Sequence, residues 1–459
     1  MSPGSGTTVT GASSPPHFVL VPMMAAGHAG PMLDMARALA SRGALVTFVT
    51  TPLNLPRLGR TSSDDALPIR FPCAEAGLPE GCESLDALLG LIFLGRFNDA
   101  CAMLSAPMTI DAPCVSLISR SRSPGNFTGP GMKEFGEEIM AESARADGLV
   151  VNSFAELEPM FVDAYETAIG KKLWTIGPLF LMSPVVSTAT AEQDTTAIRC
   201  ASWLDSKEHR SVVFVSFGSL VRSSLPQLVE IAHGLERSNR PFIWAVKPGN
   251  LAEFKQWLSD DGFESRVGER GLVVTGWAPQ KAILSHPATG AFVTHCGWNS
   301  VLECVAAGLP MVTWPHFAEQ FMNEKLVADV LRVGVPVGVK DAAQWGVGSE
   351  AVVATREDVE RAVAAVMDGG EEGASRRARA IELGRRAREA VARSASDGTC
   401  HAEEIHGISS KKNRGPGDKR HKRAPSPPPA PLRRASKRRM SEPSVNQPVD
   451  PVQPATKKQ

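Results

Sequence analysis

The sequence predicts an α/β protein made of two Rossmann-like domains that face each other across a cleft. From His17 onward, apolar runs of strand length alternate with runs of helical spacing, which is typical of βα units around a parallel sheet. A stretch rich in Thr, Ala and Ser at 183–197 interrupts this alternation, which restarts at Val212. The 459 residues are enough for two domains that each have a core of their own.

The elements are predicted from the spacing of apolar side chains. In the first domain, residues 18–23 and 45–50 are strand-like runs, and residues 32–41 carry apolar side chains at helical spacing. In the second domain, strands are predicted at 212–217, 242–247, 272–275, 291–295 and 311–314, and helices at 226–236, 356–367 and 375–393. The predicted organisation is a disordered leader at 1–16, a first Rossmann-like domain at 17–182, a linker at 183–198, a second Rossmann-like domain at 199–400 and a basic Pro-rich tail at 401–459.

The zero net charge of the chain hides an asymmetry. Residues 410–459 hold 14 Lys and Arg against 3 Asp and Glu, together with ten prolines, whereas the rest holds 35 against 46. The tail is therefore expected to be disordered. A nuclear-targeting or nucleic-acid-binding role rests on this tail alone. The alternative for the tail is a different exon or a shifted reading frame.

Composition favours a cytoplasmic protein, and a monomer is expected. Apolar residues make up 43% and charged residues 21% of the chain, as in ordinary globular proteins. The eight cysteines form no CxxC pair, which suits reduced thiols. The longest clean apolar run, 87–94, is too short to span a membrane, and the leader has no signal-peptide pattern.

The most informative stretch of the sequence is 277–320. The strand predicted at 291–295 ends at His295, Gly297 allows a close turn, and Asn299 and Ser300 favour the start of a helix. The start of a helix after a strand attracts anions such as phosphate, because unpaired N–H groups and the helix dipole point there. Glu303 shares a helix face with Ser300, where its carboxylate could accept hydrogen bonds from a ribose.

Further residues complete a candidate site for a nucleotide diphosphate sugar. Trp277 could stack on a planar base, although it could also be a core residue at the end of a strand. Gly218 and Ser219 offer a close backbone approach and a hydroxyl group to a diphosphate, a weak signal by itself. Glu319 and Gln320 place an acid and an amide side by side, which is how proteins commonly bind sugar hydroxyls. No Asp-x-Asp motif or His/Asp cluster suggests a metal.

His28 is the candidate catalytic base. It follows Gly27 after the first predicted strand, and ligands of open α/β sheets bind at such strand ends. Because histidine titrates near neutral pH, it can take a proton from a hydroxyl group. The alternative is a loop histidine that caps the following helix.

These residues closely resemble the signature box of the plant family 1 UDP-glycosyltransferases. The resemblance includes Trp277 at the start of the box, HCGWNS at 295–300 and Glu319-Gln320 at its end. It extends to 17–40, 147–159, 173–179 and 212–220, about three quarters of the chain in all. The resemblance implies the GT-B fold, with an acceptor-binding first domain and a UDP-sugar-binding second domain.

The resemblance also implies a transferase of plant secondary metabolism that moves glucose from UDP-glucose to a hydroxyl of a small lipophilic metabolite, with inversion. It assigns His28 as the base and Glu319 and Gln320 to the sugar, and Gln320 with Trp298 favours glucose. It further assigns to the UDP-sugar Gly218, Ser219, Trp277, Ala278, Gln280, His295, Gly297, Asn299, Ser300 and Glu303.

One departure from the family pattern concerns catalysis. Relatives carry two further strands and an Asp-containing loop where this chain has the short stretch 109–130, so several dozen residues are expected to be missing. The Asp that orients the base in the family has no clear counterpart here, and Asp111 is the nearest candidate. The runner-up function is therefore an inactive UDP-binding pseudoenzyme, or an incomplete gene model.

Overall fold

The structure, a computed structural model, describes residues 15, 17–22, 26–55, 66–70, 73, 115–117, 148–182, 191–247, 249–317, 319–340 and 352–396. By its internal contacts the chain divides into two compact units, residues 1–413 and 414–459, and all described residues belong to the first. The predicted leader, apart from Pro15, and the predicted tail lie outside the described residues.

Residues 17–182 contribute two parallel sheets of three strands each, in the orders β1-β2-β3 and β4-β5-β6. The strands are β1 (His17–Leu20), β2 (Leu45–Thr50), β3 (Ala66–Pro68), β4 (Val115–Leu117), β5 (Gly148–Val151) and β6 (Lys172–Thr175). Helices α1 (Ala26–Ala40) and α4 (Pro159–Ile169) and the 3₁₀ turn η5 (Leu179–Leu181) accompany them. Leu20, Phe48 and Trp174 share one core with α1, so side chains from both sheets are buried together.

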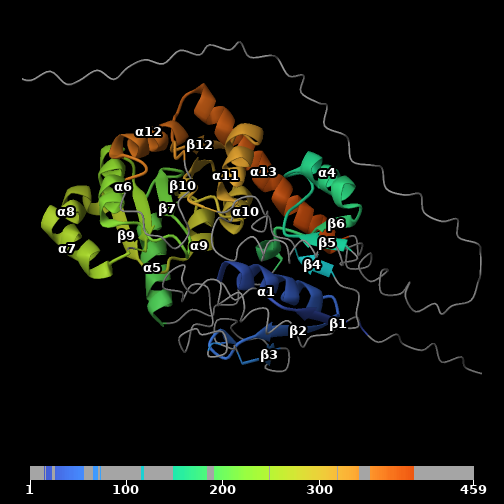
Figure 1. Cartoon of the computed structure of the whole chain (residues 1–459). Helices are drawn as coiled ribbons and strands as arrows, with labels where there is room; N and C mark the ends of the chain where they lie inside the picture. The colour runs from blue at the N-terminus through green and yellow to red at the C-terminus, as the bar shows by residue number, and fades with distance from the viewer. Residues whose placement is uncertain are drawn as a thin grey trace, which may run out of the picture. The chain divides into compact units, whose positions relative to one another are not determined.

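Residues 191–396 fold around one parallel sheet of six strands, in the order β12-β11-β10-β7-β8-β9 (Figure 1). The strands are β7 (Val212–Ser216), β8 (Phe242–Val246), β9 (Gly271–Thr275), β10 (Thr289–Thr294), β11 (Met311–Thr313) and β12 (Gly334–Pro336). If the six strands are numbered 1 to 6 in chain order, their order across the sheet from β9 is 3-2-1-4-5-6. This is the strand order of a doubly wound Rossmann sheet.

Helices cover both faces of this sheet. They are α5 (Ala191–Asp205), α6 (Leu225–Arg237), α7 (Leu251–Asp261), α8 (Phe263–Val267), α9 (Gln280–Ser285), α10 (Trp298–Ala307), α11 (Gln320–Lys325), α12 (Arg356–Val366) and α13 (Glu371–Ser396). The 3₁₀ turn η6 (Gly268–Arg270) and the π-helical turn η7 (Leu326–Val330) complete the set.

Alternate residues of β7 point to opposite cores, as the period of a strand requires. Val212 and Phe214 pack in the core that contains α5, α9, α10 and α13. Val213 and Val215 pack in the core that contains α6, α7, α8 and α12, which are grouped together in Figure 1. Because both faces are covered, the strands are apolar throughout, which is why the sequence shows continuous apolar runs.

The helix ends follow local chemistry. Thr355 and Asp358 form a capping box at the start of α12. The Asn250 side chain accepts hydrogen bonds from the N–H groups of Ala252 and Glu253 at the start of α7. None of the helices in the described ranges combines the length and the apolar character that crossing a bilayer requires.

Three sequence predictions need correction. Helix α1 begins at Ala26 instead of residue 32, so His28 lies in its first turn rather than in a loop. Helix α5 begins at Ala191, inside the predicted linker 183–198, because Glu192 and Asp194 favour the positive N-terminal end of a helix. The stretch 109–130, which is poorly patterned in the sequence and for which no strand is predicted, contains β4, which pairs in parallel with β5.

Candidate active site

The predicted site residues follow the carboxyl ends of neighbouring strands. Strands β7 and β10 pair side by side, and the chain continues from β7 toward one edge of the sheet and from β10 toward the other. This is the switch point at which open α/β sheets bind ligands. Gly218 follows β7, His295 follows β10, and Glu319 comes after β11.

The His295 ring is enclosed by two glycines. A Cβ atom at Gly218 would lie 2.6 Å from Cε1 of His295, and one at Gly297 would lie 2.4 Å from its Nε2. Gly218 also has a φ of +73°, a conformation that L side chains rarely adopt. Both positions therefore need glycine if the imidazole is to stay where it is.

The electrostatic state of His295 is set by burial. Burial, with a smaller contribution from the nearby His316, lowers the pKa of His295 to about 3. The ring is thus neutral at pH 7 and can donate one hydrogen bond. Its Nδ1 atom is buried, and among the described residues it has no hydrogen-bond partner. Buried polar side-chain atoms without a partner are uncommon in proteins, so this atom marks the start of α10 as an unusual position.

Gln280 joins Ser300 and Glu303. Its Nε2 atom lies 3.0 Å from Oγ of Ser300 and donates to Oε2 of Glu303 at 2.9 Å. The prediction that Ser300 and Glu303 share one face of α10 is confirmed. The family resemblance assigns Gln280 to the UDP-sugar but does not predict its contact with these two side chains.

The Glu303 carboxyl is half-buried next to charged groups. Burial raises the pKa of Glu303 above its ordinary value, and the negative charge of Asp34 adds to the rise. The hydrogen bond from Gln280 and the positive charge of Lys281 oppose it. Lys281 also lies 3.8 Å from Asp34, measured from Nζ to Oδ2.

The residues after β9 differ in exposure. The Trp277 side chain is 43% exposed, an unusual state for an indole, and it is therefore accessible to a planar ligand. The carbonyl of Ala278 accepts a hydrogen bond from the N–H of Gln280 at 2.8 Å, which fixes the turn into α9. Ser219 is half-buried, and its carbonyl accepts a hydrogen bond from Arg222.

Trp298 is placed differently from the other residues of the box. Its indole is buried, and Nε1 donates to the carbonyl oxygen of Asn152 at 2.7 Å. The indole N–H is thus already hydrogen-bonded to the chain segment after β5. Asn299, its neighbour in α10, is half-buried.

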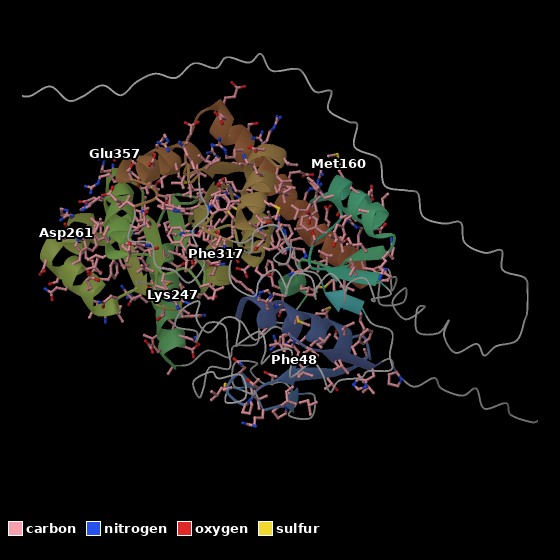
Figure 2. All side chains as sticks on the ribbon, viewed as in Figure 1. Phe48, Met160, Lys247, Asp261, Phe317 and Glu357 are labelled. Carbon is pink, nitrogen blue, oxygen red and sulfur yellow. The ribbon has the colours of Figure 1, made fainter. Side chains whose placement is uncertain are left out.

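Glu319 and Gln320 are both buried at the start of α11. Oε1 of Gln320 accepts hydrogen bonds from the N–H groups of His316 and Phe317, at 2.8 and 3.2 Å. Phe317 follows β11 and is labelled in Figure 2. Oε1 of Glu319 lies 3.4 Å from Nδ2 of Asn323.

Asn323 is a structural support that the sequence prediction missed. Its Nδ2 atom donates to the carbonyl of Cys296 at 2.8 Å. Cys296 has a φ of +63°, which is strained for a residue with a side chain. The buried Asn323 amide therefore holds the turn between His295 and Gly297. Its position, one helical turn after Glu319, was the only available signal.

His28 lies in the first turn of α1 and is partly exposed. Asp111, the candidate partner of this base, lies outside the described residues. Among the described residues, no group of three or more His, Cys, Asp and Glu side chains could hold a metal ion.

The chain is similar to known proteins over most of its length. The family model described as "UDP-glucoronosyl and UDP-glucosyl transferase" matches residues 151–370. UDP-glycosyltransferase 73E1 of Stevia rebaudiana is 37% identical over 465 aligned residues, which cover 83% of this chain and 94% of that protein. UDP-glucose flavonoid 3-O-glucosyltransferase 7 of Fragaria ananassa is 38% identical, over 82% of this chain and 92% of that protein.

The fold is similar to that of solved structures. The crystal structure of Glycyrrhiza uralensis UGT73P12 complexed with glycyrrhetinic acid 3-O-monoglucuronide matches with a TM-score of 0.74 and 31% identity. That match covers 87% of this chain and 96% of the solved chain. It confirms the predicted fold class, an α/β protein with Rossmann-like parallel sheets of the GT-B type.

The chain is shorter than its Stevia relative within the matched region. The matched 83% of 459 residues is about 381 residues, so about 84 of the 465 aligned positions in the Stevia match have no residue in this chain. Dozens of residues that the relative carries within the matched region are therefore absent here.

Proposed function

This chain belongs to the plant family 1 UDP-glycosyltransferases, and from this membership we propose that it transfers glucose from UDP-glucose to a hydroxyl of a small lipophilic metabolite. The anomeric carbon is inverted in this reaction. Glycosyl transfer from a UDP-sugar is the activity of the family. The specific sugar, acceptor class and stereochemistry are the proposal.

The observation that carries this proposal is the enclosure of His295 between Gly218 and Gly297 at the switch point of the sheet. A neutral imidazole and the N–H groups at the start of α10 suit a diphosphate, because they donate hydrogen bonds without bringing a fixed charge. Ser300 adds a hydroxyl donor at the same helix end.

The neighbouring residues supply the remaining contacts of the proposed donor site. Glu303 would accept hydrogen bonds from the ribose hydroxyls, and the exposed Trp277 would stack on the uracil. Glu319 and Gln320 would bind the glucose. The proposal for glucose is supported by the name of the strawberry relative, a glucosyltransferase that uses UDP-glucose.

The proposed reaction is one displacement. His28 takes the proton of the acceptor hydroxyl, and the acceptor oxygen forms a bond to the anomeric carbon. The bond between that carbon and the phosphate oxygen breaks, and UDP leaves with the electron pair. His295, Ser300 and the dipole of α10 stabilise the negative charge on the leaving diphosphate, and no metal is assigned a role.

A turnover assay tests this proposal. The full chain is incubated with radiolabelled UDP-glucose and a panel of phenolic and terpenoid alcohols, and product formation is measured by chromatography. We expect label transfer to one or more of these acceptors. Absence of transfer together with tight UDP binding would contradict glucosyl transfer and support the second candidate below.

Glu303 gives the donor site a predicted pH dependence. An ionised Glu303 accepts ribose hydrogen bonds, so the affinity for UDP-glucose should fall as the pH falls through the pKa of Glu303, which burial raises above its ordinary value. In this range His295, with a pKa of about 3, stays neutral and does not oppose the change. Glu303→Gln should weaken binding at pH 7 by about 1–3 kcal/mol and remove most of the pH dependence.

Isothermal titration calorimetry with UDP-glucose between pH 5 and 8 checks this prediction. Unfolding does not imitate the effect, because a carboxyl with a raised pKa in the folded state adds stability as the pH falls through that pKa. The matched control is Glu253→Gln, at an exposed position in the first turn of α7. An unchanged pH profile for Glu303→Gln would remove Glu303 from the ribose contact.

A second candidate function is an inactive UDP-binding protein. It is favoured by the roughly 84 of 465 aligned positions at which the chain, covered to 83%, lacks residues of its Stevia relative. A base without its orienting carboxylate loses several powers of ten in rate, about 10⁴-fold in the serine-protease case. UDP affinity close to that of relatives, with very low turnover, would identify this function.

A cytoplasmic location and a monomeric state are further parts of the proposal. The location is supported by the ordinary composition of the chain and by the buried thiols of Cys200, Cys296 and Cys304, which form no disulfide.

A further inference from the structure

We propose that His316 is a sugar-positioning residue whose Nε2 atom accepts a hydrogen bond from a hydroxyl of the donor glucose. This inference rests on the proposed function and assigns a contact beyond the acid and amide at 319–320. Four observations carry it: the place of His316 in the sheet, the state of its ring, the bonding of Gln320, and the accessibility of Nε2.

The position of His316 matches that of the other site residues. Strands β7, β10 and β11 are neighbours in the sheet, and their carboxyl ends lead to Phe217, His295 and His316. The rings of Phe217 and His316 meet edge to face, with centroids 5.4 Å apart. A positive charge on His316 would lower the pKa of His295. His316 therefore lies next to the enclosed imidazole at the switch point.

The ring of His316 is held in one chemical state. Its Nδ1 atom lies 2.9 Å from the carbonyl oxygen of Trp314. A carbonyl oxygen only accepts hydrogen bonds, so Nδ1 carries the proton. Burial lowers the pKa of His316 to about 4, so the ring is neutral at pH 7. In this tautomer Nε2 presents a lone pair and acts as an acceptor.

The hydrogen bonds that Gln320 already accepts limit what it can offer to a sugar. Its Oε1 atom already accepts hydrogen bonds from the N–H groups of His316 and Phe317. Gln320 therefore offers a sugar only its amide N–H groups, which donate. A sugar hydroxyl that receives a hydrogen bond from this amide still has a proton of its own to donate. The Nε2 atom of His316 is an acceptor held by the same loop.

The Nε2 atom is accessible. No group in the described part of the chain forms a hydrogen bond with it, and the residue as a whole is half-buried. Nε2 also has accessible surface, because it is not one of the described side-chain atoms that are buried and lack a hydrogen-bond partner. Nε2 is therefore open to a ligand.

A matched pair of variants distinguishes the proposed contact through Nε2 from a purely structural role through Nδ1 and the carbonyl of Trp314. In His316→Asn the amide group lies near the position of Nδ1 and can keep the bond to Trp314, but nothing replaces Nε2. In His316→Gln the amide oxygen reaches the position of Nε2, but the bond to Trp314 is lost.

The test is equilibrium binding of UDP and of UDP-glucose to the full chain by calorimetry. The ratio of the two affinities isolates the sugar contacts, because UDP lacks the glucose. We expect His316→Asn to lower the affinity for UDP-glucose about three- to tenfold with UDP affinity unchanged. His316→Gln is expected to restore most of that loss.

The outcomes separate this inference from the proposed function. The role of His316 alone would be overturned if both variants kept the wild-type ratio of UDP-glucose affinity to UDP affinity. It would also be overturned if His316→Gln lowered the affinity for UDP-glucose and His316→Asn did not. Equal losses for UDP and UDP-glucose would also overturn it, since they indicate a folding or diphosphate effect. A wild-type chain that binds neither compound would overturn the proposed function as well.

Discussion

Replacing His28 with alanine should lower the rate of glucosyl transfer by about 10²- to 10⁴-fold, the usual contribution of a general base. The affinity for UDP should not change, because the proposed UDP contacts all lie between Gly218 and Gln320. His28 is placed in the first turn of α1 and is partly exposed, so its side chain can meet an acceptor hydroxyl. The measurement is kcat with a saturating acceptor, together with the calorimetric Kd for UDP.

The matched control is His17→Ala in the same part of the chain. His17 starts β1 and its Nε2 atom lies 2.9 Å from Oγ1 of Thr47 on the paired strand, so its removal takes away an exposed structural contact. Transfer by this variant should stay within a few-fold of wild type. If His28→Ala transfers glucose as fast as the control, another group takes the proton and the assignment of His28 is wrong.

The second half of the fold was predictable because its strands are covered on both faces. Residues 212–217 are apolar at every position but one, and the strand found there runs from Val212 to Ser216. Helices α7 and α8 were missed although local signals existed. Asn250 is a good cap, Phe254 and Leu258 are spaced one turn apart and buried, and Gly262 ends α7 with a φ of +69°.

Other features depend on contacts that no local pattern contains. Strand β12 has three residues, two of them Gly334 and Pro336, which by themselves disfavour a strand. It forms because it pairs with β11 at the edge of the sheet. The bond from Trp298 to Asn152 joins residues far apart in the sequence. The sequence motif therefore singled out Trp298 but did not predict its partner.

The candidate site was predictable in composition and only partly in geometry. Ser300 and Glu303 share a face because helical spacing requires it. The contact of Gln280 with both depends on how α9 packs against α10, which the spacing does not determine. His316 was passed over because a single histidine after Trp-Pro matches no motif. Only the pairing of β10 with β11 brings it near His295.

Gly218→Ala should be among the most damaging single substitutions for UDP binding in the chain. The new Cβ atom would lie 2.6 Å from Cε1 and 2.8 Å from Nε2 of His295, closer than real Cβ contacts allow. The imidazole must then move away from the position in which it meets the diphosphate. Loss of a hydrogen bond to a charged group costs about 1.5–3 kcal/mol, so UDP affinity should fall about ten- to hundredfold.

The control for backbone strain is Gly170→Ala. Gly170 ends α4 with a φ of +65°, close to the +73° of Gly218, but a Cβ atom there would meet nothing within 4 Å. Both variants should lose stability through the positive φ, about 1–2 kcal/mol, and Gly218→Ala should lose more because its Cβ atom also meets the His295 ring. Only Gly218→Ala should lose UDP affinity. Equal UDP affinities in the two variants would show that the contact with His295 has no role in binding.

A double-mutant cycle decides whether the effect passes through His295. If the alanine at 218 acts by displacing the imidazole, it should do little further harm once the imidazole is gone. The double variant Gly218→Ala with His295→Ala should then bind UDP about as well as His295→Ala alone, a strongly non-additive result. Additive losses would mean that the new methyl group blocks the ligand itself. The glycine would then serve close approach of the diphosphate to the backbone after β7, and His295 would hold its position for another reason.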